Sequence, residues 1–192
     1  MPRIKEFDYN QKLEQARNLF WEKGYHATSM HDLVDTLKLG RSSIYDTYGN
    51  KHSLFIKCLN SYILKKEAQY LAAAKKANSP IESVKLIIKS ILKNMVLEAK
   101  TCMSVKTTFE LGKTDEETQA LLNQQAKNSV KLFSGLLHQA KENGELAGNK
   151  DPEMIAHFIV ASFGSLWNAD ILFKDKQLTQ KLTDHLISTI IN

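Results

Sequence analysis

The sequence has little that would interrupt a helix, with only 3 prolines and 8 glycines among 192 residues. Because both residue types disfavour helices, their scarcity indicates a largely helical chain. It also has only two cysteines, Cys58 and Cys102, which are too few for a disulfide framework and suit a reducing cytoplasm. A hydrophobic fraction of 43% is enough to form a core, which excludes wholesale disorder.

Several other signals are absent. No apolar run reaches the roughly 18 residues that a bilayer span requires, and Met1–Glu6 lack the apolar core of a signal peptide. There is no glycine-rich phosphate loop and no serine nucleophile elbow. The 6 histidines include no pair spaced as metal ligands on one helix face around a carboxylate. We therefore expect a soluble cytoplasmic protein that is not an enzyme, needs no cofactor or metal, and has no membrane partner.

The net charge of +5 is unevenly distributed. Residues 1–76 hold 13 Lys and Arg against 8 Asp and Glu, whereas residues 77–192 hold 13 of each. A basic surface on one part of a protein attracts polyanions such as nucleic acids. Ordinary scatter of charge explains the same counts equally well, so charge alone does not decide between a nucleic-acid binder and another class.

Apolar periodicity divides the first third of the chain into three helices. The first covers residues 8–23. Thr28 and Ser29 then open a second helix of about two turns, and a third follows Gly40 over residues 41–47. Two short helices joined by a tight turn with a glycine are typical of a helix-turn-helix.

Three stretches carry a more specific pattern: Phe20–Tyr25, Thr28–Met30 and Gly40–Leu54. Their residues, in this order and spacing, resemble TetR-family transcriptional regulators over residues 7–60. The resemblance implies an all-α fold of about nine helices. In it, residues 1–50 would form a three-helix helix-turn-helix DNA-binding domain, and residues 51–192 a helical ligand-binding and dimerisation domain.

The resemblance also implies a set of DNA-binding residues: Thr28, Ser29, Arg41, Ser42, Ser43, Tyr45, Tyr48 and Lys51. The two at the second helix would hold a phosphate, those of the third helix would face the major groove, and Lys51 would meet a second phosphate. Two alternatives stay open. Tyr48 instead packs against the first helix, and one of Thr28 and Ser29 serves only as a helix cap.

This sequence departs from the family pattern at three positions. Gly40 stands where many members carry a capping serine, and Lys38 stands where many carry the turn glycine, so a differently shaped turn is possible. Asp46 places a carboxylate on the recognition helix, where it would accept from cytosine, pair with a cation, or weaken non-specific binding.

Beyond residue 50, the pattern predicts a long helix over residues 51–76 and five further helices that end near residues 99, 111, 143, 173 and 191. The helix over residues 152–173 is apolar almost all round and should be buried on every side. With the last helix it would form a four-helix bundle across a two-fold axis, as in the family. Such a homodimer would place two recognition helices about 34–36 Å apart. The alternative is the central helix of a monomer.

The regulatory part of such a protein should contain a mostly apolar pocket. Candidates for its lining are Met95, Cys102, Met103, Phe109, Phe133, Leu137, His138, Phe163 and Trp167. Cys102 resembles the cysteine of a TetR branch that responds to reactive electrophiles, although Thr101 replaces the glycine usual before it. Its thiolate would be stabilised by the start of a helix and by Lys100. A buried, inert cysteine is the alternative.

We therefore predict a homodimeric, ligand-responsive transcriptional repressor that binds a near-palindromic double-stranded operator and is released by a small, mostly apolar or reactive effector. The alternative is a helical adaptor without sequence-specific DNA binding. An adaptor would not need the polar array between Arg41 and Lys51.

Overall fold

The computed structural model describes residues 7–98 and 101–191, and within them it contains nine α-helices and no strand. The helices are α1 (Tyr9–Lys23), α2 (Met30–Leu37), α3 (Arg41–Tyr48), α4 (Lys51–Ala74), α5 (Pro80–Glu98), α6 (Met103–Leu111), α7 (Glu116–Glu142), α8 (Pro152–Phe173) and α9 (Lys176–Ile191). The predicted all-α fold is confirmed. The leading Met1–Glu6 segment and the break expected at Lys100 lie outside the described residues.

Local side-chain chemistry defines the helix ends. Asp8, Asp115 and Asp151 each accept hydrogen bonds from backbone N–H groups in the first turns of α1, α7 and α8. Each such cap stabilises a helix by about 1 kcal/mol. Gly24 ends α1 at a φ of 91°, a conformation that strains any residue with a side chain.

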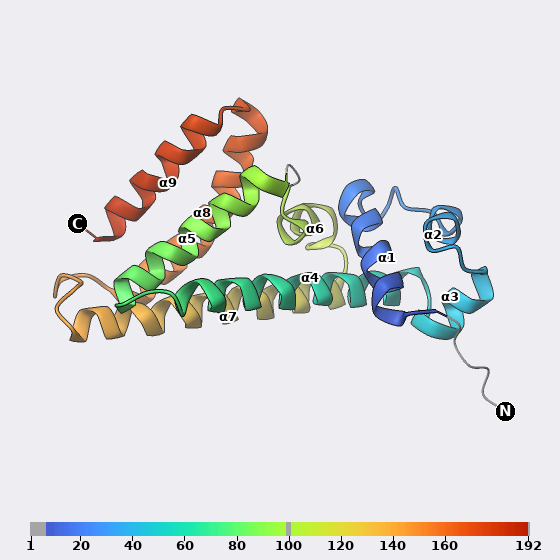
Figure 1. The fold of residues 1–192 in the computed structure, drawn as a ribbon, viewed down its shortest axis with the longest axis horizontal. Helices are drawn as coiled ribbons and strands as arrows, with labels where there is room; N and C mark the ends of the chain where they lie inside the picture. The colour runs from blue at the N-terminus through green and yellow to red at the C-terminus, as the bar shows by residue number, and fades with distance from the viewer. Residues whose placement is uncertain (1–6, 99–100, 192) are drawn as a thin grey trace.

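The apolar side chains form two cores. Figure 1 shows α1–α3 grouped at one end of an elongated molecule, with α4 and α7 running lengthwise toward α5, α8 and α9. The first core joins α1–α3 to the first half of α4 and to Met103 and Leu111 of α6. The second is built from α5, α7, α8 and α9, and Tyr70 near the end of α4 packs against it. The helix α4 therefore packs in both cores and joins them as one continuous helix.

The helix α8 is apolar but only partly covered. By length and composition it is the one described helix that could cross a bilayer, with a mean hydropathy of 1.3 over 18 residues, of which 22% are buried. Polar residues such as His157 and Ser162 interrupt its apolar run, and the core helix of a soluble protein can have the same length and composition. What α8 shows plainly is apolar surface that its own chain leaves exposed, including Met154, Phe158 and Leu172.

Candidate nucleic-acid interface

The helix α3 has an anchored side and an outward side. Ile44 and Tyr48 are 0% and 1% exposed, and both belong to the first core. The Tyr48 hydroxyl donates to the Tyr9 carbonyl at 2.9 Å, and the two rings lie 4.8 Å apart. Burial is the main cause that raises the pKa of Tyr48 to about 12. Tyr48 therefore holds α3 against α1, and the prediction that it contacts DNA is wrong for this conformation.

The outward side presents the side chains expected to face the groove. Arg41, Ser42 and Asp46 are exposed, Ser43 is half-buried, and Tyr45 is 39% exposed. The Arg41 guanidinium lies 5.7 Å from the centre of the Tyr45 ring and donates to its hydroxyl at 3.4 Å. This pairing aligns a forked donor with a flat aromatic face, two groups that suit base edges and phosphates. The three alternatives for Asp46 stay open.

The turn between α2 and α3 keeps the shape that a glycine would give it. Lys38 adopts the left-handed conformation, with φ 52° and ψ 40°, and its N–H donates to the Val34 carbonyl. Lysine thus stands in place of the usual glycine without changing the shape of the turn. A residue with a side chain is strained in this conformation. Gly40 is the N-cap of α3, where it provides no side-chain hydrogen bond.

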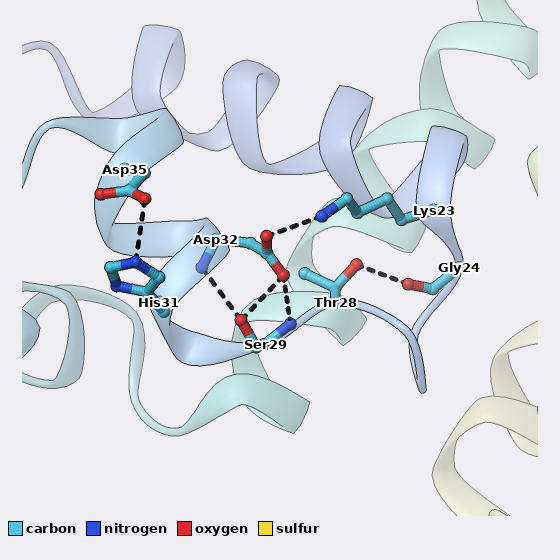
Figure 2. A network of polar contacts seen from close by, with 7 residues as sticks. All are labelled: Lys23, Gly24, Thr28, Ser29, His31, Asp32 and Asp35. Carbon is cyan, nitrogen blue, oxygen red and sulfur yellow. Dashed lines mark hydrogen bonds and ion pairs between the residues drawn. The ribbon is translucent and has the colours of Figure 1, made fainter.

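The start of α2 is held by the polar network in Figure 2. The Ser29 hydroxyl accepts from the Asp32 N–H at 3.1 Å, and the Asp32 carboxylate accepts from the Ser29 N–H at 2.8 Å. Lys23 of α1 lies 2.6 Å from Asp32. The hydrogen bond from Lys23, followed by those from Ser29, lowers the pKa of Asp32. Ser29 is exposed, so it can still meet a phosphate beside the first turn of α2.

Thr28 has a different position from its neighbour. It is fully buried, and its hydroxyl donates to the Gly24 carbonyl at 2.6 Å (Figure 2). Its backbone N–H donates to the Tyr25 carbonyl. Both donors are therefore used inside the protein, so the prediction that Thr28 binds a phosphate is wrong for this conformation. The cap of α2 is Ser29, whereas Thr28 forms its hydrogen bonds inside the protein.

Lys51 begins α4 and lies against an aromatic ring. Its ammonium is 4.4 Å from the centre of the Tyr25 ring. Burial lowers the pKa of Lys51, and Glu110 and Asp32 oppose that shift. An ammonium has three N–H donors. The face of an aromatic ring is not a conventional hydrogen-bond acceptor, so the contact with Tyr25 leaves these donors available. Lys51 can therefore hold a phosphate from this position.

Polar contacts from α6 hold the end of α1, and sequence reasoning missed them. The Lys106 ammonium donates to the carbonyls of Trp21 and Glu22, at 3.2 and 2.8 Å. The Glu110 carboxylate accepts from the backbone N–H groups of Tyr25 and His26, at 3.1 and 2.8 Å. Lys106 thus satisfies carbonyls that the end of α1 leaves unpaired, and Glu110 satisfies N–H groups in the loop that follows it.

A second polar contact joins α4 to the start of α7. The His52 Nε2 atom lies 2.8 Å from Asp115, and Nδ1 lies 3.5 Å from Glu117. A hydrogen bond from Thr118 is the main cause that lowers the pKa of Asp115, and His52 adds to it. The helices predicted to read DNA are therefore connected to the remainder of the chain through α4 and α6, and α4 is in turn joined to the start of α7.

The residues predicted to line a ligand pocket separate into three groups. Met95, Met103, Phe133 and Leu137 are buried and fill the two cores. Cys102, Phe163 and Trp167 line a cavity of about 160 Å³. Trp167 also lines a larger cavity of about 560 Å³, together with Phe109. His138 is exposed on α7, and its Nε2 atom lies 3.5 Å from the Glu153 carboxylate.

Cys102 is the N-cap of α6, as expected from the sequence. It is half-buried, and its sulfur accepts a hydrogen bond from the Tyr62 hydroxyl at 3.4 Å. Burial raises the pKa of Tyr62, which keeps that proton on the phenol. Lys100, the cation expected near the thiolate, lies outside the described residues.

Two family models match the chain. "Bacterial regulatory proteins, tetR family" matches residues 13–58, and "Tetracyclin repressor-like, C-terminal domain" matches residues 81–186. The uncharacterised HTH-type transcriptional regulator YezE of Bacillus subtilis (strain 168) is 35% identical over 173 residues, which cover 86% of this chain and 87% of the relative. The HTH-type transcriptional repressor ComR of Escherichia coli (strain K12) is 27% identical over 161 residues, covering 82% and 76%.

Solved structures share the fold. A cysteine mutant of the TetR family transcriptional regulator CifR, complexed with double-strand operator DNA, has a TM-score of 0.83 at 20% identity and covers 97% of this chain and 98% of its own. The reduced form of Escherichia coli NemR has a TM-score of 0.84 at 16% identity and covers 95% and 96%. At these identities the likeness shows the arrangement of helices and nothing about ligands.

Proposed function

This chain belongs to the TetR family of bacterial regulatory proteins and is a DNA-binding transcriptional regulator, and on that premise we propose that it is a homodimeric, ligand-responsive repressor acting in the cytoplasm. The main support for the proposal is that α3 has one buried side and one exposed side. Buried Ile44 and Tyr48 fix the helix, which leaves Arg41, Ser42 and Tyr45 exposed together on one short surface. A structural helix has no need of such a surface.

The DNA-binding surface that we propose has six of the eight predicted residues. Arg41, Ser42, Ser43 and Tyr45 enter the major groove, while Ser29 and Lys51 hold phosphates on either side. Thr28 and Tyr48 position α2 and α3 from inside the protein. The DNA-binding domain comprises residues 1–50 and the regulatory domain residues 51–192, with α4 anchored in both cores.

The proposed dimer uses α8 and α9. Exposed residues follow one another at intervals of three or four along α8, which places them on one stripe: Met154, Phe158, Ala161, Ser165, Asn168 and Leu172. Met154, Phe158 and Leu172 are 65%, 50% and 66% exposed. The small residues between them allow a second helix to approach closely, and large exposed apolar patches mark contact sites. A two-fold axis here forms a four-helix bundle.

We further propose that a small, mostly apolar or reactive effector releases the dimer from its operator. Support comes from the cavities beside α6 and α8 and from the shared helix α4, which connects them to α3. The dimer can adopt more than one spacing of its two α3 helices. A ligand that binds more tightly to the dimer with one spacing raises the population of dimers with that spacing. ComR, which is named as a repressor, supports the repressor assignment by relationship.

Selection of DNA from a random pool by the purified chain tests this proposal. We expect enrichment of a near-palindromic site whose half-sites are about one helical turn apart, 10–10.5 base pairs between centres. Enrichment of no sequence, with binding that depends only on salt, would favour a helical adaptor and would refute the regulator.

A further inference from the structure

The larger cavity lies between the end of α1, α6 and the second half of α8. Its volume of about 560 Å³ falls in the range of small-molecule sites. Trp21, Trp167 and Phe109 supply its aromatic walls, and Ile171 adds an aliphatic one. Phe109 is 85% exposed, so packing within the chain does not account for it. These walls favour a flat, apolar ligand.

The cavity also contains a positioned cation. Lys106 lines it, is half-buried, and donates two hydrogen bonds to the carbonyls that end α1. Because an ammonium has three donors, one remains for a ligand. Among the described residues, no carboxylate forms an ion pair with Lys106. Asn168, on the α8 wall, adds an amide. Glu22 and Thr101 complete the polar lining. Lys106 and Asn168 supply the side-chain N–H donors that an anion with oxygen acceptors would use.

We propose that this cavity is the effector site and that it binds an aromatic monocarboxylate. The ring lies among Trp21, Trp167 and Phe109, and the carboxylate accepts from Lys106. The carboxylate takes the third donor of the Lys106 ammonium and attracts it toward the cavity, which weakens its hydrogen bonds to the Trp21 and Glu22 carbonyls and loosens the contact between α6 and α1. The inference rests on the proposed regulator, since it gives the chemical class of that regulator's effector.

Intrinsic fluorescence provides a direct test, because the chain has only 2 tryptophans and both line this cavity. The full chain is titrated with hydrocinnamate and with its neutral amide, hydrocinnamamide. We expect the acid to change the emission and to bind about tenfold more tightly than the amide, as a charge-assisted hydrogen bond requires. The acid, and not the amide, should also weaken binding to the selected operator.

Three variants separate the contributions. Lys106→Met should abolish the preference for the acid, whereas Lys113→Met, which removes an exposed lysine outside the cavity, should retain it. Phe109→Ala should weaken both probes, and since Phe109 is so exposed, its removal should not unfold the chain. Circular dichroism checks the fold of each variant.

Three results would overturn the inference: equal affinity for acid and amide, no fluorescence response to either probe, or an acid preference that survives in folded Lys106→Met. An acid that binds without weakening operator binding would also overturn it, because the site would then not be the effector site. Failure to select any operator refutes the proposed regulator instead, and the titration still decides whether the cavity binds a carboxylate.

Discussion

Tyr45 and Tyr48 are three positions apart on α3, and their hydroxyls have different environments. The Tyr45 hydroxyl meets Arg41 on the exposed surface, whereas that of Tyr48 donates to a carbonyl of α1. A tyrosine suits either setting, so the sequence alone left both roles open for Tyr48. The contact with Tyr9, 39 residues away in the chain, decides between them. The same is true of Thr28, because only the fold shows that its hydroxyl donates to the Gly24 carbonyl.

Lys38 gives a prediction at this scale. Its left-handed conformation costs a residue with a side chain about 1 kcal/mol, and glycine avoids that cost. Lys38→Gly should therefore raise the free energy of unfolding by roughly 0.5–1 kcal/mol, less the entropy that glycine adds to the unfolded chain. Urea denaturation measures it. The matched control is Lys57→Gly, at an exposed position inside α4, which should lose about 1 kcal/mol. Destabilisation by both changes would contradict the strain at Lys38.

At the scale of elements, helix boundaries were predictable because the signals that set them are local. Asp8, Asp115 and Asp151 cap the helices that follow within one or two residues. The contacts of α6 with α1 were not predictable, because Lys106 and Glu110 bind backbone atoms 84 or 85 residues away. Backbone carbonyls and N–H groups occur in almost every residue, so the residue type does not show which of them a side chain binds. Only the packing of α6 against α1 reveals these partners.

Glu110 tests whether α6 stabilises the reading helices. Its two carboxylate oxygens accept from the Tyr25 and His26 N–H groups, and glutamine has only one oxygen to offer. We expect Glu110→Gln to lower the free energy of unfolding by about 1–2 kcal/mol. Denaturant titration provides the measurement. Glu142→Gln, an exposed position on α7 with no side-chain hydrogen bond among the described residues, is the matched control. Equal stability of both variants would show that the Glu110 contacts contribute nothing.

At the scale of the whole molecule, the sequence predicted that α8 needs a partner, and the chain alone leaves its stripe exposed. Phe158→Asp places a charge in the proposed interface, where burial without a counterion is costly. We expect the dissociation constant of the dimer to rise at least about tenfold. Sedimentation velocity over a range of concentrations measures it. Leu64→Asp, at an equally exposed apolar position on α4, should leave the dimer intact. A dimer unaffected by Phe158→Asp would place the interface elsewhere.

The central claim is that the exposed side of α3 reads DNA while its buried side only holds the helix. The most direct test is the ratio of affinities for the selected operator and for a scrambled duplex, measured at one salt concentration. We predict that Tyr45→Ala lowers this ratio about tenfold, a loss of about 1–2 kcal/mol of discrimination, while the fold is retained. Tyr48→Phe, which removes only the hydrogen bond to Tyr9, should keep the ratio. A ratio unchanged in Tyr45→Ala, or lost in folded Tyr48→Phe, would contradict the account.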